Sequence, residues 1–157
     1  MKYYCHFSCP LGPVTLVENK GGITHLYLAQ SLQIPQAQLA KTPLLTEACR
    51  QLEEYFAGQR RTFALPLAPS GTEFQKKVWR ALCQIPYGQT RTYKDIAQAI
   101  GCPKGFRAVG LANNKNPIAI FIPCHRVIGA NGRLVGYAGG VHLKKYLLEL
   151  EGISIPE

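Results

Sequence analysis

The sequence is poor in charged residues and lacks the long apolar runs that membrane helices need. Charged residues make up 17% of the 157 positions, and acidic residues (9) are half as numerous as basic ones (18). No apolar run approaches the ~18–20 residues of a membrane span. The first six residues, 1–6, lack the apolar core of a signal peptide. With 46% hydrophobic residues, the composition indicates a folded globular protein, which we expect in the cytoplasm, or in the nucleus if the source is eukaryotic.

The six cysteines lack the regular spacing of a disulfide framework. They are scattered along the chain at Cys5, Cys9, Cys49, Cys83, Cys102 and Cys124. A zinc site built from Cys5 and Cys9 with His6 and His25 stays open as an alternative, although no C-x-x-C pair supports it. Buried or unreactive thiols are the simpler interpretation, so no metal site is predicted.

The basic charge is unevenly distributed along the chain. Residues 1–69 contain six Lys or Arg and four Asp or Glu, a net charge of +2. Residues 70–157 contain twelve and five, a net charge of +7. A basic half of this kind indicates an anionic partner, most often nucleic acid, whereas a merely soluble basic surface is the alternative.

The pattern of residues 1–69 predicts a small α/β unit. Segments 14–17 and 23–28 are strand-like, and Asn-Lys-Gly-Gly at 19–22 favours a turn between them. Thr42 and Pro43 are suited to begin a helix that Gly58 ends. One face of that helix would be apolar, with Leu45, Ala48, Leu52 and Phe56. Residues 66–71 are interpreted as a linker.

The following segment predicts three helices. Thr72 and Gln75 fit a capping box before an apolar face of Phe74, Val78 and Leu82. A short helix is expected from Thr92 to about Gly101, and another over 105–114. Two short helices joined by a glycine-containing turn resemble a helix-turn-helix. On the second of them we expect four side chains at the surface: Arg107, Val109, Asn113 and Asn114.

The apolar run 118–122 predicts a buried strand that leads directly to Cys124 and His125. Cysteine attacks as a thiolate, and an imidazole can take its proton. His125 could reach the sulfur through a water if the chain turns, with Glu151 orienting the ring. A lone Cys-His pair is nevertheless often accidental.

The remaining residues predict two further elements. Asn-Gly at 131–132 predicts a tight turn, and a last helix with Leu143, Leu147 and Leu150 should end at Gly152.

The surroundings of Cys124 resemble the O6-alkylguanine-DNA alkyltransferases. Residues 123–129, Pro-Cys-His-Arg-Val-Ile-Gly, match the active-site signature of that family. Other matches follow the family's order and spacing: Tyr93, Arg-Ala-Val-Gly at 107–110, Asn-Pro at 116–117, Gly-Tyr-Ala-Gly-Gly at 136–140 and Leu-Leu-Glu-Leu-Glu-Gly at 147–152. The resemblance is strong over residues 72–152 and loose over residues 10–66.

The resemblance implies an α+β protein of two domains. Residues 1–69 would form a ribonuclease-H-like α/β domain with its linker, and residues 70–157 a winged-helix-like, helix-turn-helix DNA-binding domain. The implied reaction transfers an alkyl group from the O6 atom of guanine in double-stranded DNA to Cys124, once per molecule. The same resemblance leaves O4-alkylthymine open as a second substrate. It implies no cofactor, a flipped lesion base and a monomeric protein.

The resemblance also assigns catalytic roles. Cys124 would accept the alkyl group, and His125, through a water, would form with Glu151 the relay that favours the thiolate. Tyr93 would donate a hydrogen bond to guanine N3 and ease the departure of the O6 oxygen.

Four further residues would bind DNA. The target atom is inaccessible in a duplex, so the nucleotide must be extruded, and Arg107 would fill the gap that it leaves. Ala108 and Gly110 would permit close approach of the helix to the minor groove. Asn116 would tie this helix to the active-site segment.

The base pocket is implied in the same way. The Val127 carbonyl would accept from the exocyclic amine of guanine, and Tyr137 and the Ala138 amide would line the pocket with Tyr93. Lys144 would support Tyr137. Ala138 departs from relatives that have serine there, so only a backbone contact is expected from it.

Two other functions are compatible with parts of this pattern. Alkyltransferase-like proteins bind lesions without repairing them, but usually have tryptophan where this chain has Cys124. A Cys-His hydrolase would turn over many substrates and need not bind DNA.

Overall fold

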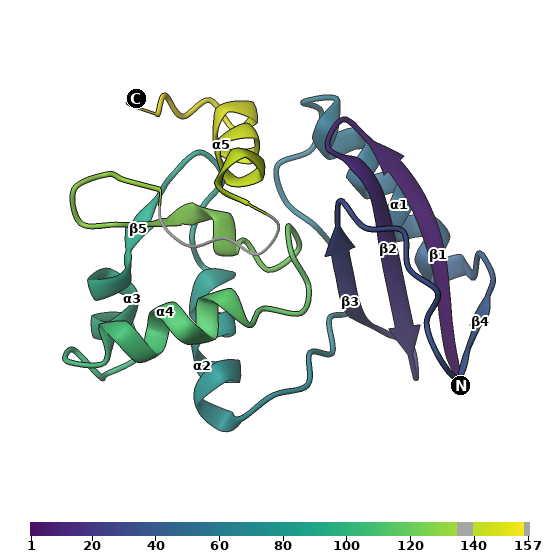
Figure 1. Ribbon diagram of the computed structural model, residues 1–157, viewed down its shortest axis with the longest axis horizontal. Helices are drawn as coiled ribbons and strands as arrows, with labels where there is room; N and C mark the ends of the chain where they lie inside the picture. The colour runs from purple at the N-terminus through teal and green to yellow at the C-terminus, as the bar shows by residue number, and fades with distance from the viewer. Residues whose placement is uncertain (135–139, 156–157) are drawn as a thin grey trace. The chain divides into compact units, whose positions relative to one another are not determined.

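The chain folds into two compact units, in a computed structural model that describes residues 1–134 and 140–155. The N-terminal unit consists of Met1–Ser70 and Pro117–Ala119, and the C-terminal unit of Gly71–Asn116 and Ile120–Glu157. Figure 1 shows the sheet of the first unit and the helices of the second.

A four-stranded sheet forms the centre of the N-terminal unit. Its strands are β1 (Lys2–Cys9), β2 (Gly12–Asn19), β3 (Gly22–Leu28) and β4 (Ala37–Leu39), in the order β3-β2-β1-β4. β2 pairs antiparallel with both β1 and β3, whereas β4 runs parallel to β1. The predicted turn is confirmed: Lys20 and Gly21 both have positive φ, 52° and 80°, as a two-residue hairpin turn requires.

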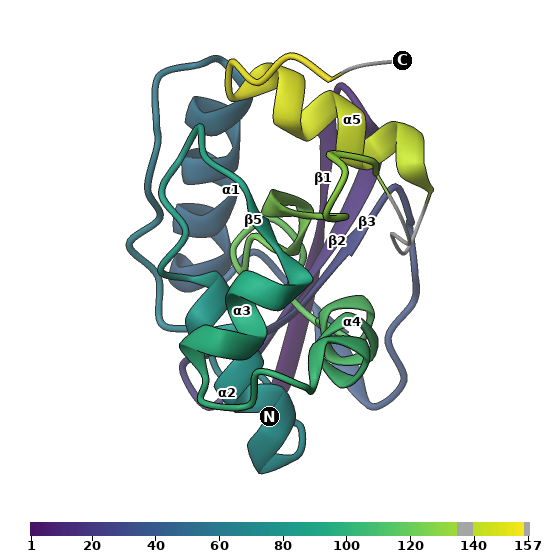
Figure 2. The same ribbon diagram turned by 90° about the vertical axis from the view of Figure 1, so that its left-hand side faces the viewer.

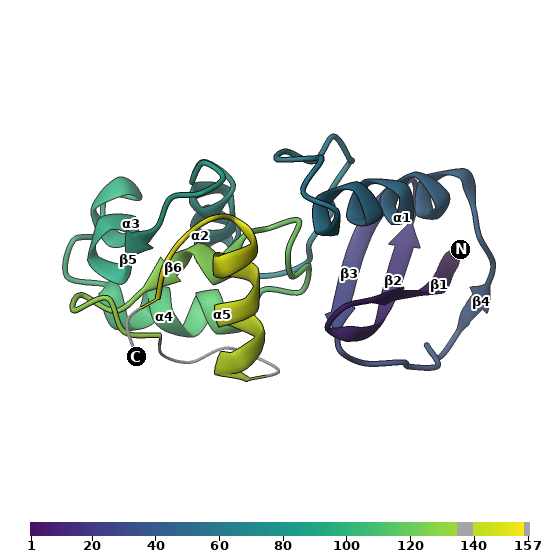
Figure 3. The same cartoon turned by 90° about the horizontal axis from the view of Figure 1, so that it is seen from above.

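Helix α1 (Pro43–Phe56) covers one face of this sheet (Figure 3). The predicted start is confirmed, because Thr42 accepts a hydrogen bond from the Leu45 amide and Pro43 occupies the first turn. Gly58, with φ of 76°, follows the end of the helix. The buried side of α1 consists of Leu45, Ala48, Cys49, Gln51, Leu52 and Tyr55.

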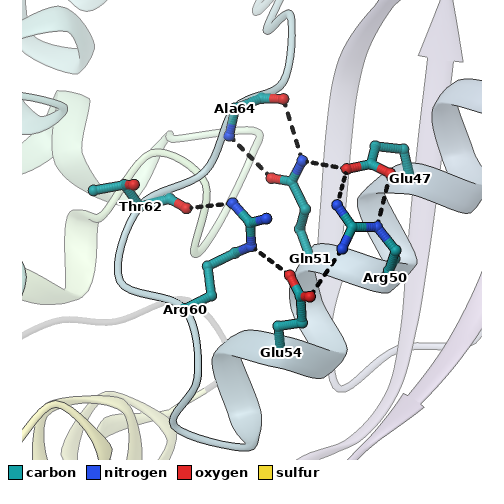
Figure 4. Close-up of polar contacts among 7 residues, drawn as sticks. All are labelled: Glu47, Arg50, Gln51, Glu54, Arg60, Thr62 and Ala64. Atoms are coloured by element: carbon teal, nitrogen blue, oxygen red, sulfur yellow. Dashed lines mark hydrogen bonds and ion pairs between the residues drawn. The ribbon is translucent and has the colours of Figure 1, made fainter.

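Polar side chains of α1 hold the loop that follows it (Figure 4). Arg50 and Arg60 both pair with Glu54 at 2.8 Å, but these contacts are partly exposed and contribute little to stability. Gln51 is buried and exchanges two hydrogen bonds with the backbone of Ala64, of 2.9 and 3.2 Å. Gln51 therefore fixes the loop more firmly than the ion pairs do.

Two segments outside the strands extend the sheet at β3. The Ile23 amide donates to the Pro66 carbonyl, and the Ala68 amide donates back to Ile23, so part of the predicted linker 66–71 pairs with the sheet. The Leu26 amide donates to the Pro117 carbonyl. The predicted strand over 118–122 is wrong: only isolated bridges form, and Ile120 has φ of 72°, which turns the chain.

Helices build most of the C-terminal unit. They are α2 (Glu73–Leu82), α3 (Tyr93–Ala99), α4 (Phe106–Asn114) and α5 (Val141–Leu150), with the 3-10 helix η1 (Cys124–Arg126). The short strands β5 (Arg91–Thr92) and β6 (Val127–Ile128) pair in parallel. α2, α3 and α4 gather at one end of this unit and α5 lies at the other (Figure 2).

Local signals explain where these helices begin. Thr72 and Thr92 both form capping boxes, with Gln75 and Asp95 respectively, so each start has its orphan amides satisfied. The indole of Trp79 in α2 donates to the Ala112 carbonyl at 2.9 Å and fixes α4 against α2.

The longest described helix has 14 residues, about 21 Å, and none in the described ranges is long and apolar enough to cross a membrane.

Candidate active site

Cys124 opens the 3-10 turn η1 rather than following a strand. The turn begins immediately, since the Cys124 amide donates to the Ile122 carbonyl at 2.7 Å. The same carbonyl accepts from the Asn116 side chain at 2.8 Å, which ties the end of α4 to the segment before the cysteine. Cys124 is 5% exposed, so its sulfur is enclosed by the protein rather than displayed on the surface.

A buried histidine–carboxylate pair follows directly. Nε2 of His125 lies 2.7 Å from Oε2 of Glu151, and both side chains are fully buried. In the neutral ring the proton sits on Nε2, facing the carboxylate, so Nδ1 is the acceptor. Nδ1 is buried and has no hydrogen-bond partner among the described residues. The ring is therefore oriented to receive a proton at Nδ1.

Burial decides the charge of this imidazole. It lowers the pKa of His125, and although the neighbouring Glu151 opposes that shift, the pKa stays below its ordinary value. The histidine is consequently neutral at neutral pH and can act as a base.

Glu151 is held by more than the histidine. Arg126 donates to both of its oxygens, from Nε at 2.8 Å and from Nη2 at 3.0 Å, and the Gly88 amide donates at 3.2 Å. A further bond from Arg126 Nη1 to the Ile85 carbonyl, of 2.8 Å, anchors the guanidinium. Sequence reasoning missed Arg126, although it lies inside the signature at 123–129, because nothing local shows that its partner is 25 residues away.

Asn113 is a second residue that sequence reasoning misplaced. Together with Val109 it was expected at the surface of α4, but both are buried because this side of the helix faces α2 and α3. Nδ2 of Asn113 donates to the Cys124 carbonyl at 3.4 Å, and its Oδ1 has no hydrogen-bond partner within the described ranges. Asn113 thus contacts the backbone of the nucleophile.

Tyr93 and Lys144 lie close enough to Cys124 to interact with its charge. Burial raises the pKa of Tyr93, and a thiolate at Cys124 raises it further, so the phenol keeps its proton and can donate. Burial lowers the pKa of the fully buried Lys144 to about 8, although the thiolate opposes this shift. The site therefore combines a nucleophile, a base, a hydrogen-bond donor and a buried cation.

The outer side of α4 carries the other predicted contacts. Arg107 and Ala108 are exposed, as a DNA-binding role requires. Gly110 is half-buried, and a Cβ built there would lie 3.7 Å from the Tyr93 ring, so its small size brings α4 close to that ring. Asn114 is exposed.

The base-pocket residues are only partly described. Val127 is fully buried in β6, where it pairs with Arg91, so only its backbone is available to a ligand. Tyr137 and Ala138 lie outside the described residues.

The N-terminal histidines and cysteines do not converge. His6 bonds to Thr15 and His25 to Thr24, and Cys9 donates to the Gly12 carbonyl. In the described part of the chain, no three His, Cys, Asp or Glu side chains are grouped as a metal site would need.

Comparison with known proteins identifies the family. The model of the 6-O-methylguanine DNA methyltransferase DNA-binding domain matches residues 73–153, and that of the ribonuclease-like domain of the same proteins matches residues 2–69. The chain therefore belongs to the 6-O-methylguanine DNA methyltransferase family. The resemblance and the fold class inferred from sequence are both confirmed.

Individual relatives match over almost their whole length. The methylated-DNA–protein-cysteine methyltransferase of Methanosarcina barkeri is 54% identical over 152 residues, covering 95% of this chain and 96% of the relative. The constitutive enzyme of Bacillus subtilis is 49% identical, covering 100% and 99%. The structure of Mycobacterium tuberculosis OGT in complex with DNA is 46% identical, with a TM-score of 0.89, and covers 95% of this chain and 92% of that one.

Proposed function

We propose that this protein repairs DNA by transferring the alkyl group of O6-alkylguanine to its own Cys124. The observation that carries the proposal is the buried His125–Glu151 pair, which leaves the imidazole neutral with its Nδ1 as the acceptor, on the residue that directly follows Cys124 in sequence. The full-length similarity to methylated-DNA–protein-cysteine methyltransferases supports the same reaction. The chemistry needs no cofactor.

The transfer is a displacement in which the proton of the thiol ends on the repaired base: His125 takes it up first and releases it to water, and the guanine anion that leaves is protonated at N1. The Cys124 thiol gives its proton through a water to Nδ1 of His125, and the thiolate attacks the alkyl carbon. The carbon–O6 bond breaks, and its electron pair stays on the guanine, where a hydrogen bond from Tyr93 to N3 stabilises the developing charge. The product is a thioether, which no group in the site can cleave, so each molecule reacts once.

Double-stranded DNA that carries the lesion is the proposed partner. The exposed Arg107 would fill the space left by the extruded nucleotide, with Ala108 and Gly110 letting α4 approach the minor groove. Asn116 would couple the position of α4 to Cys124, because its side chain bonds to Ile122. Most of the positive charge, +7, lies in residues 70–157, to which we assign DNA binding and alkyl transfer, and residues 1–69 are assigned to the ribonuclease-H-like domain and linker.

The base pocket is proposed around Tyr93. The Val127 carbonyl would recognise the guanine amine, with Tyr137 and the Ala138 amide as further lining and Lys144 as support.

We propose a monomer, since one chain supplies every group that the reaction needs. Because the substrate is chromosomal DNA, we place the protein in the compartment that holds the chromosome, the cytoplasm or a eukaryotic nucleus.

Stoichiometry tests the proposal. With excess duplex DNA containing radiolabelled O6-methylguanine, label on the protein should plateau at about one methyl group per chain, because the thioether is permanent. Mass analysis should locate a gain of about 14 Da, one CH₂, on Cys124. Cys124→Ala should abolish transfer, whereas Cys83→Ala, at an exposed cysteine, should leave the plateau unchanged.

Two outcomes would contradict it. Sustained turnover would favour a Cys-His hydrolase. Tight binding of the lesion without any transfer would favour a protein that only marks damage.

A further inference from the structure

A pair of thiols lies buried in the N-terminal unit, whereas the residues of the proposed reaction belong to the C-terminal unit. Sγ of Cys5 in β1 and Sγ of Cys49 in α1 are 3.8 Å apart, in contact across the interface of helix and sheet. Cys5 is 2% exposed and Cys49 is 7% exposed. The two residues are 44 positions apart in sequence, so only the packing of α1 on the sheet brings them together.

The two sulfurs are not equivalent. The hydrogen bond between the two thiols lowers the pKa of Cys49, which the positive charge of Lys41 also favours. The same arrangement raises the pKa of Cys5, because removing its proton would cost that hydrogen bond and leave two adjacent negative charges. Cys49 is therefore the thiolate that forms first, and it is also the more exposed of the two.

We propose that Cys5 and Cys49 form a modification site, a dithiol that hydrogen peroxide oxidises to a disulfide. Nothing in the alkyl-transfer reaction uses these residues, so the site is independent of the proposed function. The sulfurs lie 3.8 Å apart, so closing the bond requires them to approach by roughly 1.8 Å, to a covalent length of about 2.05 Å.

The oxidation proceeds in two balanced steps. The Cys49 thiolate attacks one oxygen of the peroxide and breaks the O–O bond, giving sulfenic acid at Cys49 and, with one proton, water. The Cys5 sulfur then displaces the hydroxyl group from that sulfenic acid, forming the S–S bond and releasing a second water as its own proton leaves. The protein loses two protons and two electrons, and the peroxide gains them as it becomes two waters.

The surroundings favour a disulfide over a metal site. Thiolate zinc sites take four ligands, and in the described chain no third histidine, cysteine or carboxylate joins this pair. The neighbouring His6 alternates to the opposite face of β1, where it bonds to Thr15.

The disulfide would close a ring from residue 5 to residue 49. That ring contains all of β2, β3 and β4, so the crosslink would tie the first strand to the helix that covers the sheet. A ring of this length restricts the unfolded chain strongly, and it should stabilise the N-terminal unit under oxidising conditions.

The test uses the full chain with Cys9, Cys83, Cys102 and Cys124 replaced by serine, leaving only the pair. After treatment with hydrogen peroxide we expect a loss of 2 Da that dithiothreitol reverses. Trypsin digestion without reductant should then link peptide 3–20 to peptide 42–50. The midpoint of thermal unfolding should rise by roughly 5 °C or more, and fall back on reduction. The wild-type chain, mapped in parallel, should yield the same Cys5–Cys49 link, which guards against a folding defect in the serine variant.

Single replacements in that background provide matched controls. Cys5→Ser should stop the reaction at the sulfenic acid of Cys49, which dimedone would trap, and Cys49→Ser should suppress oxidation at Cys5. Neither variant should gain stability with peroxide. Oxidation of Cys49 to sulfinic acid without a linked peptide, in both the serine variant and the wild type, would overturn the proposal. So would a stability gain that persists in Cys5→Ser.

Discussion

The hydrogen bonds of Glu151 determine which ring nitrogen of His125 carries the proton, and the substitution Glu151→Gln tests this assignment. Oε1 of Glu151 accepts from two N–H groups, of Arg126 and Gly88, so a glutamine should keep its oxygen there and turn its NH₂ toward His125. That NH₂ donates to Nε2, which moves the ring proton to Nδ1 and removes the acceptor for the cysteine proton. We expect single-turnover transfer to slow by roughly 10²- to 10⁴-fold.

The pH profile distinguishes loss of the base from misfolding. In the wild type, burial lowers the pKa of His125 from its ordinary ~6.5, so transfer should stay constant from neutral pH down past ~6.5 and fall only at lower pH, where the imidazole takes up a proton. The variant should be slow at every pH while still binding lesion DNA. Glu149→Gln, on the exposed side of the same helix, is the matched control and should behave as wild type. A variant with wild-type rate and pH profile would show that Glu151 serves folding alone.

The sequence predicted single site residues unevenly. Cys124 and His125 are adjacent and could be found from their chemistry, whereas the pairing of His125 with Glu151, 26 residues later, depends on how α5 packs; the sequence offered Glu151 only as one acid that could orient the ring, and the family resemblance gave it that role. Arg126 and Asn113 were missed for the same reason: a buried ion pair and a buried amide look in sequence like ordinary surface residues.

At the scale of elements, α4 exposes Arg107, which we propose contacts DNA, while the opposite side of the helix is fixed by the bond from Trp79 to Ala112. We expect Arg107→Ala to slow repair of duplex DNA much more than transfer from the free base O6-benzylguanine, because only the duplex requires extrusion of the nucleotide. Single-turnover rates on both substrates provide the measurement. Lys104→Ala, a nearby exposed cation before α4, should weaken duplex binding without this selective effect. Equal losses on both substrates for Arg107→Ala would indicate a role in folding.

Elements with strong local signals were predictable and the others were not. Capping residues and turn glycines predicted the starts of α1, α2 and α3 and the β2–β3 turn. β1 was missed because tyrosine, cysteine and histidine, rather than aliphatic residues, occupy much of the strand, so its sequence shows no clear alternation of hydrophobic and polar residues. The apolar run 118–122 was taken for a strand because hydrophobicity reports burial, which is correct there, but does not report the positive φ of Ile120.

At the scale of the whole molecule, alkylation should reduce stability. Cys124 is 5% exposed, so an added methyl group must fit into packed protein, and overpacking typically costs ~1–3 kcal/mol. This cost is a substantial part of the free energy of unfolding of a typical protein, which is ~5–15 kcal/mol. We expect the methylated protein to melt several degrees lower than the unmodified one, and the benzylated protein lower still.

Thermal unfolding of the three forms, with protease susceptibility as a second measure, checks this expectation. Cys124→Ser exposed to the same DNA controls for bound substrate, since it cannot be alkylated at this position. Identical melting of all three forms would mean that the site accommodates the group without strain.

The pairing of Pro117–Ala119 with β3 gives the chain an unusual route. After leaving the N-terminal unit at residue 70, the backbone returns to it for three residues, and Cys124 comes only five residues after that visit ends. Neither unit is therefore a continuous stretch of sequence, and no single cut separates them. A fragment starting at residue 70 would keep every catalytic side chain but deprive Ile118 of its bridge to Leu26. The first 69 residues are thus linked through this bridge to the segment that leads into Cys124.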